Sequence, residues 1–197
     1  MQAPLCLGDQ APLFSARSTE GDFSLDNFPG HWLFLLFCHE AFDAIATTEI
    51  VSLSGNIGLF SKKKCQPLII TGSSLFSNLA WLHSIHHHNT VEMDLPIIED
   101  PTYEIFNAYQ CHNYKKKNRS FFLIDSMNNI RWVCHYPSNV GLDIEEILRT
   151  LTALQHNDQN NTLSPADWHP GEPSIFHTVS DRKTMISMGE KWFYCLQ

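Results

Sequence analysis

The sequence is short of basic residues, of paired cysteines and of long apolar runs. With 13 lysines and arginines against 21 aspartates and glutamates, its net charge of -8 is opposite to that of a general nucleic-acid-binding protein. No apolar run approaches the roughly 20 residues of a membrane-spanning helix, and no basic start precedes an apolar run as in a secretory signal. Without a C-x-x-C pair, the cysteines indicate neither a zinc ribbon nor a dithiol redox motif. We therefore expect a cytoplasmic protein with free thiols and with no nucleic-acid or membrane partner.

Histidine is the abundant residue type, with 11 copies, and three of the six cysteines directly precede a histidine. These pairs are Cys38–His39, Cys111–His112 and Cys134–His135. They fall on separate predicted strand ends and loops, so they form no spaced ligand motif in the sequence. Strand ends can converge in space, and a divalent-metal site of His39, Asp43 and His112 therefore stays open as an alternative. No other cofactor is expected.

Apolar runs and helical spacings alternate along the chain, and 43% of the residues are hydrophobic. This pattern predicts an α/β fold in three layers. The predicted strands are 32–37, 67–71, 120–124 and 130–135, with the last two forming a hairpin, and the predicted helices are 47–64, 77–83 and 144–154. We expect the histidines at 83 and 86–88 to lie in a loop after the second helix. The polar segment 156–162 predicts a linker to a tail with no clear core of its own.

A series of short motifs occurs in order along most of the chain. They are Leu7–Phe14 (LGDQAPLF), Phe28–Trp32, Thr47–Ile50 (TTEI), Leu79–Trp81 (LAW), Arg119–Asp125 (RSFFLID), Tyr136–Gly141, Glu146–Arg149 (EILR) and Ala166–Glu172 (ADWHPGE). With these motifs the chain resembles the peroxiredoxins of the alkyl hydroperoxide reductase and thiol-specific antioxidant type, nearest to their one-cysteine branch. The resemblance implies a thioredoxin-like three-layer domain with a central mixed sheet over residues 1–156. It also implies a C-terminal arm over 157–197 that crosses onto a partner subunit, and hence a homodimer.

The catalytic signature of that family, P-x-x-x-T-x-x-C, is replaced here at every defined position. If Thr47-Thr48-Glu49 is aligned with the family's T-T-E, the peroxidatic cysteine corresponds to Ala46, the threonine to Asp43 and the proline to His39. In the family, that cysteine sits at a helix N-terminus, where the dipole lowers its pKa. Alanine has no nucleophilic atom, so the resemblance implies that peroxide is not reduced at this position.

The rest of the family's polar site is only partly present. The resemblance places Arg119 and its helper Glu49 in the former peroxide pocket, together with Trp81, whereas a second arginine is replaced by Leu142. Cys38 precedes the pocket at the end of the central strand. Because side chains alternate along a strand, we expect Cys38 to point away from His39 into the core.

The main hypothesis is that the pocket has been repurposed to bind, and to transform, a small molecule. In it His39 moves protons, Asp43 orients the imidazole, and Arg119 holds an anionic group. One alternative is an inert pseudoenzyme or interaction module, in which Asp43 simply pairs with Arg119. Another is a thiol peroxidase that uses Cys38, or a trap variant at Ala46. An enzyme is favoured, but not a standard cysteine peroxidase.

Overall fold

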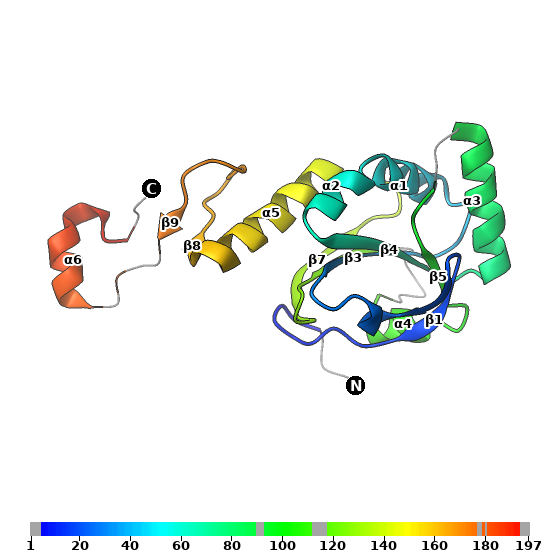
Figure 1. Ribbon diagram of the computed structural model, residues 1–197, viewed down its shortest axis with the longest axis horizontal. Helices are drawn as coiled ribbons and strands as arrows, with labels where there is room; N and C mark the ends of the chain where they lie inside the picture. The colour runs from blue at the N-terminus through cyan, green and yellow to red at the C-terminus, as the bar shows by residue number, and fades with distance from the viewer. Residues whose placement is uncertain (1–4, 90–92, 112–117, 177–178, 180, 194–197) are drawn as a thin grey trace. The chain divides into compact units, whose positions relative to one another are not determined.

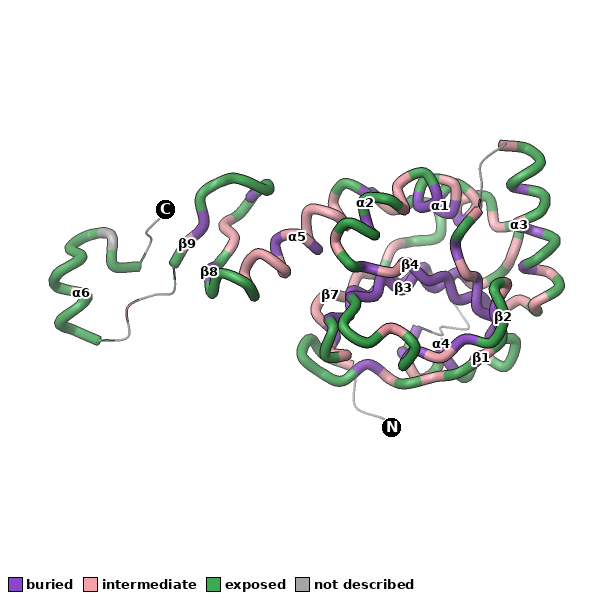
Figure 2. Tube along the Cα trace, in the orientation of Figure 1, coloured by how far each residue is buried: buried purple, intermediate pink, exposed green. Residues whose placement is uncertain are grey.

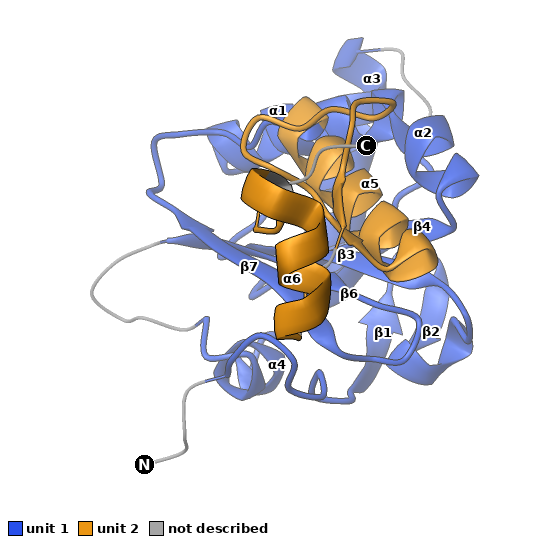
Figure 3. Cartoon of the chain, turned by 90° about the vertical axis from the view of Figure 1, so that its left-hand side faces the viewer, with its two compact units in different colours: residues 1–144 blue, residues 145–197 orange. Residues whose placement is uncertain are grey.

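The computed structural model describes residues 5–89, 93–111, 118–176, 179 and 181–193 of the chain. It divides into two compact units, residues 1–144 and 145–197 (Figure 3). The sequence motifs placed a boundary between residues 156 and 157, which lies inside helix α5, Ile144–Asn160.

Unit 1 is built on a mixed sheet of seven strands. They are β1 (Ser15–Ser18), β2 (Gly21–Ser24), β3 (Trp32–Cys38), β4 (Cys65–Thr71), β5 (Ile97–Glu99), β6 (Arg119–Ile124) and β7 (Ile130–Tyr136), in the spatial order β2-β1-β5-β4-β3-β6-β7. Strands β3, β4 and β5 run parallel, whereas β6 runs antiparallel to β3 and forms the predicted hairpin with β7. All the predicted strands are present, and the α/β class is confirmed.

Helices cover both faces of this sheet (Figure 1). They are α1 (Ala44–Gly55), α2 (Ile57–Lys62), α3 (Leu75–Asn89) and α4 (Glu104–Ala108), with a short 3-10 turn, η1, at Leu25–Asn27. Helices α1 and α2 lie on one face and α4 on the other, while α3 packs beside α1 and β5. Unit 1 therefore has the three layers that the alternating pattern predicts.

Strand β3 is buried along its whole length and forms the centre of the core (Figure 2). On the side of α2, Phe34 stacks on Phe60 and on Phe121. On the opposite face, Phe37 packs edge-on against Phe106 of α4 and tilts against Tyr109. Because both faces of β3 are covered by apolar side chains, its sequence is a continuous apolar run instead of an alternating one.

Two of the local predictions in unit 1 are wrong. The helix predicted over 47–64 is two helices, because the backbone turns at Asn56, between Gly55 and α2. Helix α3 continues to Asn89, so His86, His87 and His88 form its last turn and not a loop. A cationic or dipolar side chain is favourable at that end of a helix, and the buried side chain of Ile85 holds the last turns in place.

The linker predicted over 156–162 is also wrong, because α5 runs to Asn160. Within unit 2, the ring of His156 lies 5.1 Å from that of Trp168, and its Nε2 is hydrogen-bonded to Ser174. Asn157 accepts from the hydroxyl of Ser164. These contacts to residues far along the chain stabilise helix where the composition is typical of a loop.

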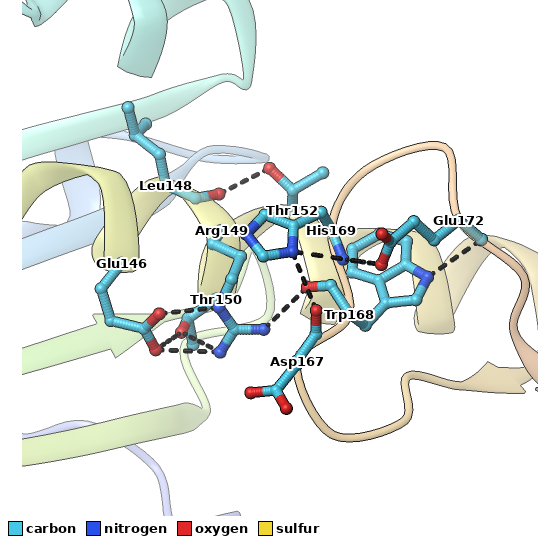
Figure 4. Close-up of polar contacts among 9 residues, drawn as sticks. All are labelled: Glu146, Leu148, Arg149, Thr150, Thr152, Asp167, Trp168, His169 and Glu172. Atoms are coloured by element: carbon cyan, nitrogen blue, oxygen red, sulfur yellow. Dashed lines mark hydrogen bonds and ion pairs between the residues drawn. The ribbon is translucent and has the colours of Figure 1, made fainter.

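The motif around Trp168 organises unit 2 (Figure 4). Arg149 pairs with Glu146 at 2.7 Å and donates to the Trp168 carbonyl, while the indole Nε1 of Trp168 donates to the carbonyl of Glu172. Trp168 is only 2% exposed, so the tail does have a buried anchor, contrary to expectation. A short ribbon of β8 (Thr162–Leu163) and β9 (Ile175–Phe176), helix α6 (Arg182–Met188) and a 3-10 turn, η2 (Gly189–Lys191), complete the unit.

No helix in the described part of the chain combines the length and the apolar character that crossing a bilayer requires. The cytoplasmic location stays a prediction.

Candidate functional site

The predicted site residues meet at one edge of the sheet of unit 1. The end of β3 lies beside the start of β6, with Phe37 opposite Ser120 in the register. This pairing brings the segment after β3 and the first turn of α1 next to the first residue of β6. They enclose a small cavity lined by Cys38, His39, Glu40, Asp43, Ala46, Arg119 and Ser138.

The cavity is very small. Its volume is about 20 Å³, and a single water molecule needs roughly 10–15 Å³ by the same measure. The site therefore has room for about one water molecule, or for a ligand of very few atoms. The volume of the cavity depends on how far each lining side chain extends into it, so only the tertiary structure reveals it.

The carboxylate of Asp43 is used by the helix that follows it. Asp43 is the N-cap of α1, and its Oδ1 accepts a hydrogen bond of 2.8 Å from the backbone N–H of Ala46. Its carbonyl oxygen also accepts from the Thr47 hydroxyl at 2.7 Å. An aspartate is among the preferred residues here because it satisfies one of the unpaired N–H groups of the first turn. Asp43 thus has a structural role at the start of α1 that accounts for an aspartate here without any catalysis.

Replacing Asp43 with alanine is expected to lower the free energy of unfolding by about 1 kcal/mol through loss of the cap. Asparagine caps a helix about as well as aspartate, so Asp43→Asn is the matched control and should retain the stability. Urea denaturation of the three proteins measures the difference. Equal losses in both variants would mean that the negative charge, and not the cap, is what the fold requires.

Arg119 is fully engaged with the loop that follows β7. Its Nη1 donates to the Ser138 carbonyl at 2.9 Å, and its Nη2 donates to the carbonyls of Pro137 and Val140. Its Nε forms an ion pair with Glu49 Oε1 at 2.9 Å, although the N–H is not aligned for a hydrogen bond. Only 4% of the residue is exposed. These bonds leave one N–H of Nη1 unused among the described residues, so an anion entering the cavity would have one guanidinium donor to bind unless it displaced the carbonyl oxygens.

Glu49 ties α1 to the same loop. Its Oε1 also accepts from the backbone N–H of Leu142 at 3.0 Å, while its Oε2 has no hydrogen-bond partner among the described residues. Burial raises the pKa of Glu49 to about 7, an effect that the charge of Arg119 and the Leu142 N–H only partly offset. Since the carboxyl group sits behind Arg119, its contribution is to position the guanidinium and the loop.

The thiol of Cys38 lines the cavity but is poorly suited to nucleophilic attack. Cys38 is 1% exposed. Burial, followed by the nearby negative charge of Glu49, raises its pKa well above the usual range of a thiol. Since the thiolate is the reactive form, Cys38 lacks the environment of an activated cysteine. Cys38 is buried in the core as expected, but it also lines the cavity, which was not expected.

The structure brings together most of the residues that the sequence singled out. His39, Asp43, Ala46, Cys38 and Arg119 surround the cavity. The ring of His39 lies 5.5 Å from that of Phe106. Two residues that line the cavity, Glu40 and Ser138, were missed; only their proximity to His39 and to the motif beginning at Tyr136 could have indicated them.

Three other predicted pocket residues do not line the cavity. Glu49 and Leu142 lie behind Arg119 and hold each other through a hydrogen bond. Trp81 is buried in α3, where its Nε1 donates to the Thr47 hydroxyl at 3.0 Å and its ring faces Phe42. Trp81 therefore supports the first turn of α1 from the side and is not among the residues that line the cavity.

The alternative metal site includes His112, which lies outside the residues that the structure describes, so this site stays a prediction. In the described ranges, no three histidine, cysteine, aspartate or glutamate side chains are placed together to hold a metal ion. His39 and Asp43 are the only members of the predicted set that can be located, and the carboxylate of Asp43 already accepts from the helix.

Comparison with known sequences gives consistent matches over nearly the whole chain. The model of the AhpC/TSA family matches residues 7–133. Peroxiredoxin 2 of Picrophilus torridus is 34% identical over 197 residues, which are 97% of this chain and 98% of that protein. A peroxiredoxin of Thermoplasma volcanium is also 34% identical, over 87% of this chain and 86% of its own length.

Solved structures match the fold to a similar extent. A yeast mitochondrial 1-Cys peroxiredoxin superimposes with a TM-score of 0.83 and 27% identity, covering 87% of this chain and 86% of its own. A cysteine-to-serine mutant of peroxiredoxin 6 of Arenicola marina gives a TM-score of 0.84 at 24% identity, covering 91% and 86%. These matches confirm the thioredoxin-like α/β fold that the motifs implied.

Proposed function

Because the chain belongs to the AhpC/TSA family of peroxiredoxins, we propose that it is a member without cysteine-based peroxide reduction at its pocket, acting as an interaction module. The residue in the first turn of α1 that corresponds to the peroxidatic cysteine is Ala46, which is 1% exposed and faces the cavity. Its side chain can supply neither a thiolate nor a proton.

A single observation carries the proposal: two of the polar groups of the pocket, Asp43 and Arg119, already serve the fold. Asp43 holds the N–H of Ala46, and Arg119 holds three backbone carbonyls and Glu49. With room for about one water molecule, the cavity offers no volume for a sizeable substrate. Two aromatic side chains of the same unit, Phe42 and Phe76, are exposed and available for contact with another protein.

The variant Ala46→Cys tests whether the pocket retains its catalytic capacity. A cysteine there would lie in the first turn of α1, but next to the Asp43 carboxylate and a guanidinium engaged elsewhere. We therefore expect no consumption of hydrogen peroxide with a thiol reductant, for the natural chain or for Ala46→Cys. A cysteine-containing peroxiredoxin such as the relative from Picrophilus torridus, assayed in parallel, is the positive control for the assay. Activity of the single variant would contradict the proposal and indicate a recently silenced peroxidase.

A second candidate function is acid–base chemistry on a very small molecule. It is favoured by the clustering of His39, Glu40 and Asp43 around one cavity that also reaches Arg119. The imidazole would exchange a proton with the ligand, and the guanidinium would interact with its anionic group. The cavity volume restricts such a ligand to a few heavy atoms.

Titration of the protein with formate, the smallest carboxylate, tests this second candidate by calorimetry. It predicts saturable binding that is lost in His39→Ala and kept in His135→Ala. His135 is a suitable control because it is exposed on β7 and hydrogen-bonds to Ser120, away from the residues that line the cavity. If formate does not bind, or binds equally to both variants, the pocket is not repurposed in this way.

The proposal includes a homodimer held by the C-terminal arm. Unit 2 ends in a set of exposed apolar side chains, Ile186, Trp192 and Phe193, on α6 and the segment after it. These three side chains line an open hollow on the surface of unit 2, together with Met185. Exposed apolar patches of this kind mark protein–protein contacts, which supports the partner-crossing arm that the family resemblance implied.

Sedimentation equilibrium measures the predicted assembly directly. We expect a dimer for the natural chain and a monomer for the double variant Ile186→Glu, Phe193→Glu, because two charges would have to be buried on association. Met127→Glu is the matched control, since Met127 is 76% exposed but lies in the β6–β7 turn of unit 1. A monomeric natural chain, or a dimer insensitive to the double variant, would rule out this arm contact.

A further inference from the structure

Helix α3 presents a row of histidines that plays no part in the cavity. His83, His86, His87 and His88 occupy its last two turns, and all of them are exposed. The side chains that anchor the helix to unit 1 are Asn78, Trp81 and Ile85, all of them buried. The sequence pattern alone predicted a loop here, in which no fixed spacing between the imidazoles would exist.

The helix sets the relative positions of these histidines. At about 100° and 1.5 Å per residue, His83 and His87 are about 40° apart around the axis and about 6 Å apart along it. By the same rotation they stand on the side of α3 opposite Trp81 and Ile85. His88 is turned about 100° further than His87, onto the flank. Residues four apart on one helix face are neighbours whose side chains can converge on a common point.

We propose that His83 and His87 form a surface binding site for a transition-metal ion of the Cu²⁺ or Zn²⁺ class. Two imidazoles at positions i and i+4 of a helix can coordinate the same ion, as in helical zinc motifs. Imidazole nitrogen suits Cu²⁺, Zn²⁺ and Ni²⁺, whereas Mg²⁺ and Ca²⁺ require oxygen ligands. Because the described residues hold no group of three metal-ligating side chains, this site has two protein ligands, with water filling the remaining positions.

This inference is independent of the cavity and of whether peroxide is reduced. The four helical histidines lie on α3, whereas the cavity is lined by the segment after β3, the start of α1, Arg119 and Ser138. The pairing requires only that α3 stays helical through its last turn. The packing of Trp81 and Ile85 and the bond from the Leu75 N–H to Glu99 Oε2, at 2.6 Å, hold this helix at both ends.

The test is a metal titration of the full-length, metal-depleted protein with Cu²⁺, Zn²⁺ and Mg²⁺ by calorimetry. We expect one strong site for Cu²⁺ and Zn²⁺ and none for Mg²⁺. Two ligands on one rigid helix act as a linked pair, so removing one in His83→Ala or His87→Ala should weaken binding on the order of a hundredfold. His88→Ala removes a neighbouring exposed histidine from the flank and should leave the affinity unchanged.

Two further readouts separate a built site from scattered binding to the protein's other histidines. The Cu²⁺ electron paramagnetic resonance spectrum should show coupling to two nitrogens, reduced to one in either single variant. Zn²⁺ should raise the melting temperature of the natural chain and of His88→Ala, but not of His83→Ala. Circular dichroism verifies that each variant is folded. If His88→Ala weakens binding as much as His83→Ala, or if the spectrum shows one nitrogen, an adventitious ion only is bound and the proposal fails.

Discussion

Replacing Arg119 with methionine is expected to lower the free energy of unfolding by about 3–5 kcal/mol, because it leaves a buried carboxylate without its partner. The substitution removes the ion pair with Glu49 and the donors to the carbonyls of Pro137, Ser138 and Val140. Urea denaturation at pH 8, where Glu49 is ionised, measures the loss. Hydrogen exchange should show faster opening of the loop after β7, which these bonds hold in place.

Two controls separate this effect from loss of an ordinary ion pair. Arg17→Met removes the partner of Glu99, whose buried carboxylate keeps the hydrogen bond from the Leu75 N–H. Because the Arg17 side chain is 58% exposed and makes this one ion pair, its loss is expected to cost less than that of the buried Arg119. The double variant Arg119→Met, Glu49→Met removes both buried charges and should recover part of the stability. A single-variant loss as small as that of Arg17→Met would show that Arg119 is not structural, and would strengthen the ligand-binding alternative.

The stability of the protein is expected to fall as the pH rises from 4.5 to 7, through Glu49. Its pKa lies near 7 in the folded chain, against an ordinary value of 4.5. Over that interval the unfolded chain releases this proton while the folded chain retains it, so deprotonation favours unfolding. Each unit of pKa difference corresponds to about 1.4 kcal/mol, which makes the total effect of this group about 3 kcal/mol.

The comparison that isolates this effect is between the natural chain and Glu49→Gln, in which the side chain cannot ionise. Urea denaturation at several pH values should give a natural curve that falls relative to the glutamine curve between pH 4.5 and 7. Other carboxyl groups contribute equally to both curves. Glu20→Gln, which removes an exposed carboxyl from the β1–β2 turn, is the control and should leave the shape unchanged. Parallel curves for the natural chain and Glu49→Gln would contradict a raised pKa.

These two expectations are coupled through the same ion pair. The charge of Arg119 lowers the pKa of Glu49 against the larger effect of burial, so Arg119→Met should extend the falling part of the stability curve above pH 7. A guanidinium that holds three carbonyls and a carboxylate has one N–H donor left for an anion, and two-point binding of an anion would require breaking these bonds. The stability experiments therefore bear directly on the choice between an inert pocket and a ligand-binding one.

The sequence alone was sufficient for the architecture of unit 1 and for the family. The apolar run 32–37 reads as a buried strand because both of its faces meet apolar layers, and the hairpin around Asp125 is visible in its turn residues. The ordered motifs from Leu7 to Glu172 indicated the family that the comparisons show. Features of this kind are local in the chain or repeated along it, so they can be predicted from the sequence without knowledge of the packing.

What the tertiary structure alone decided is how each polar group is used. The sequence brought His39, Asp43 and Arg119 to one pocket, but not the facts that Asp43 caps α1 and that Arg119 binds the carbonyls of 137–140. It likewise read the end of α3 and residues 156–160 as irregular. The burial of Ile85 and the contacts of His156 and Asn157 with residues further along the chain stabilise those turns. Which partner a polar side chain binds depends on the groups that folding places around it. The partner that is bound and the volume of the cavity depend on packing in three dimensions, which the order of residues does not show directly.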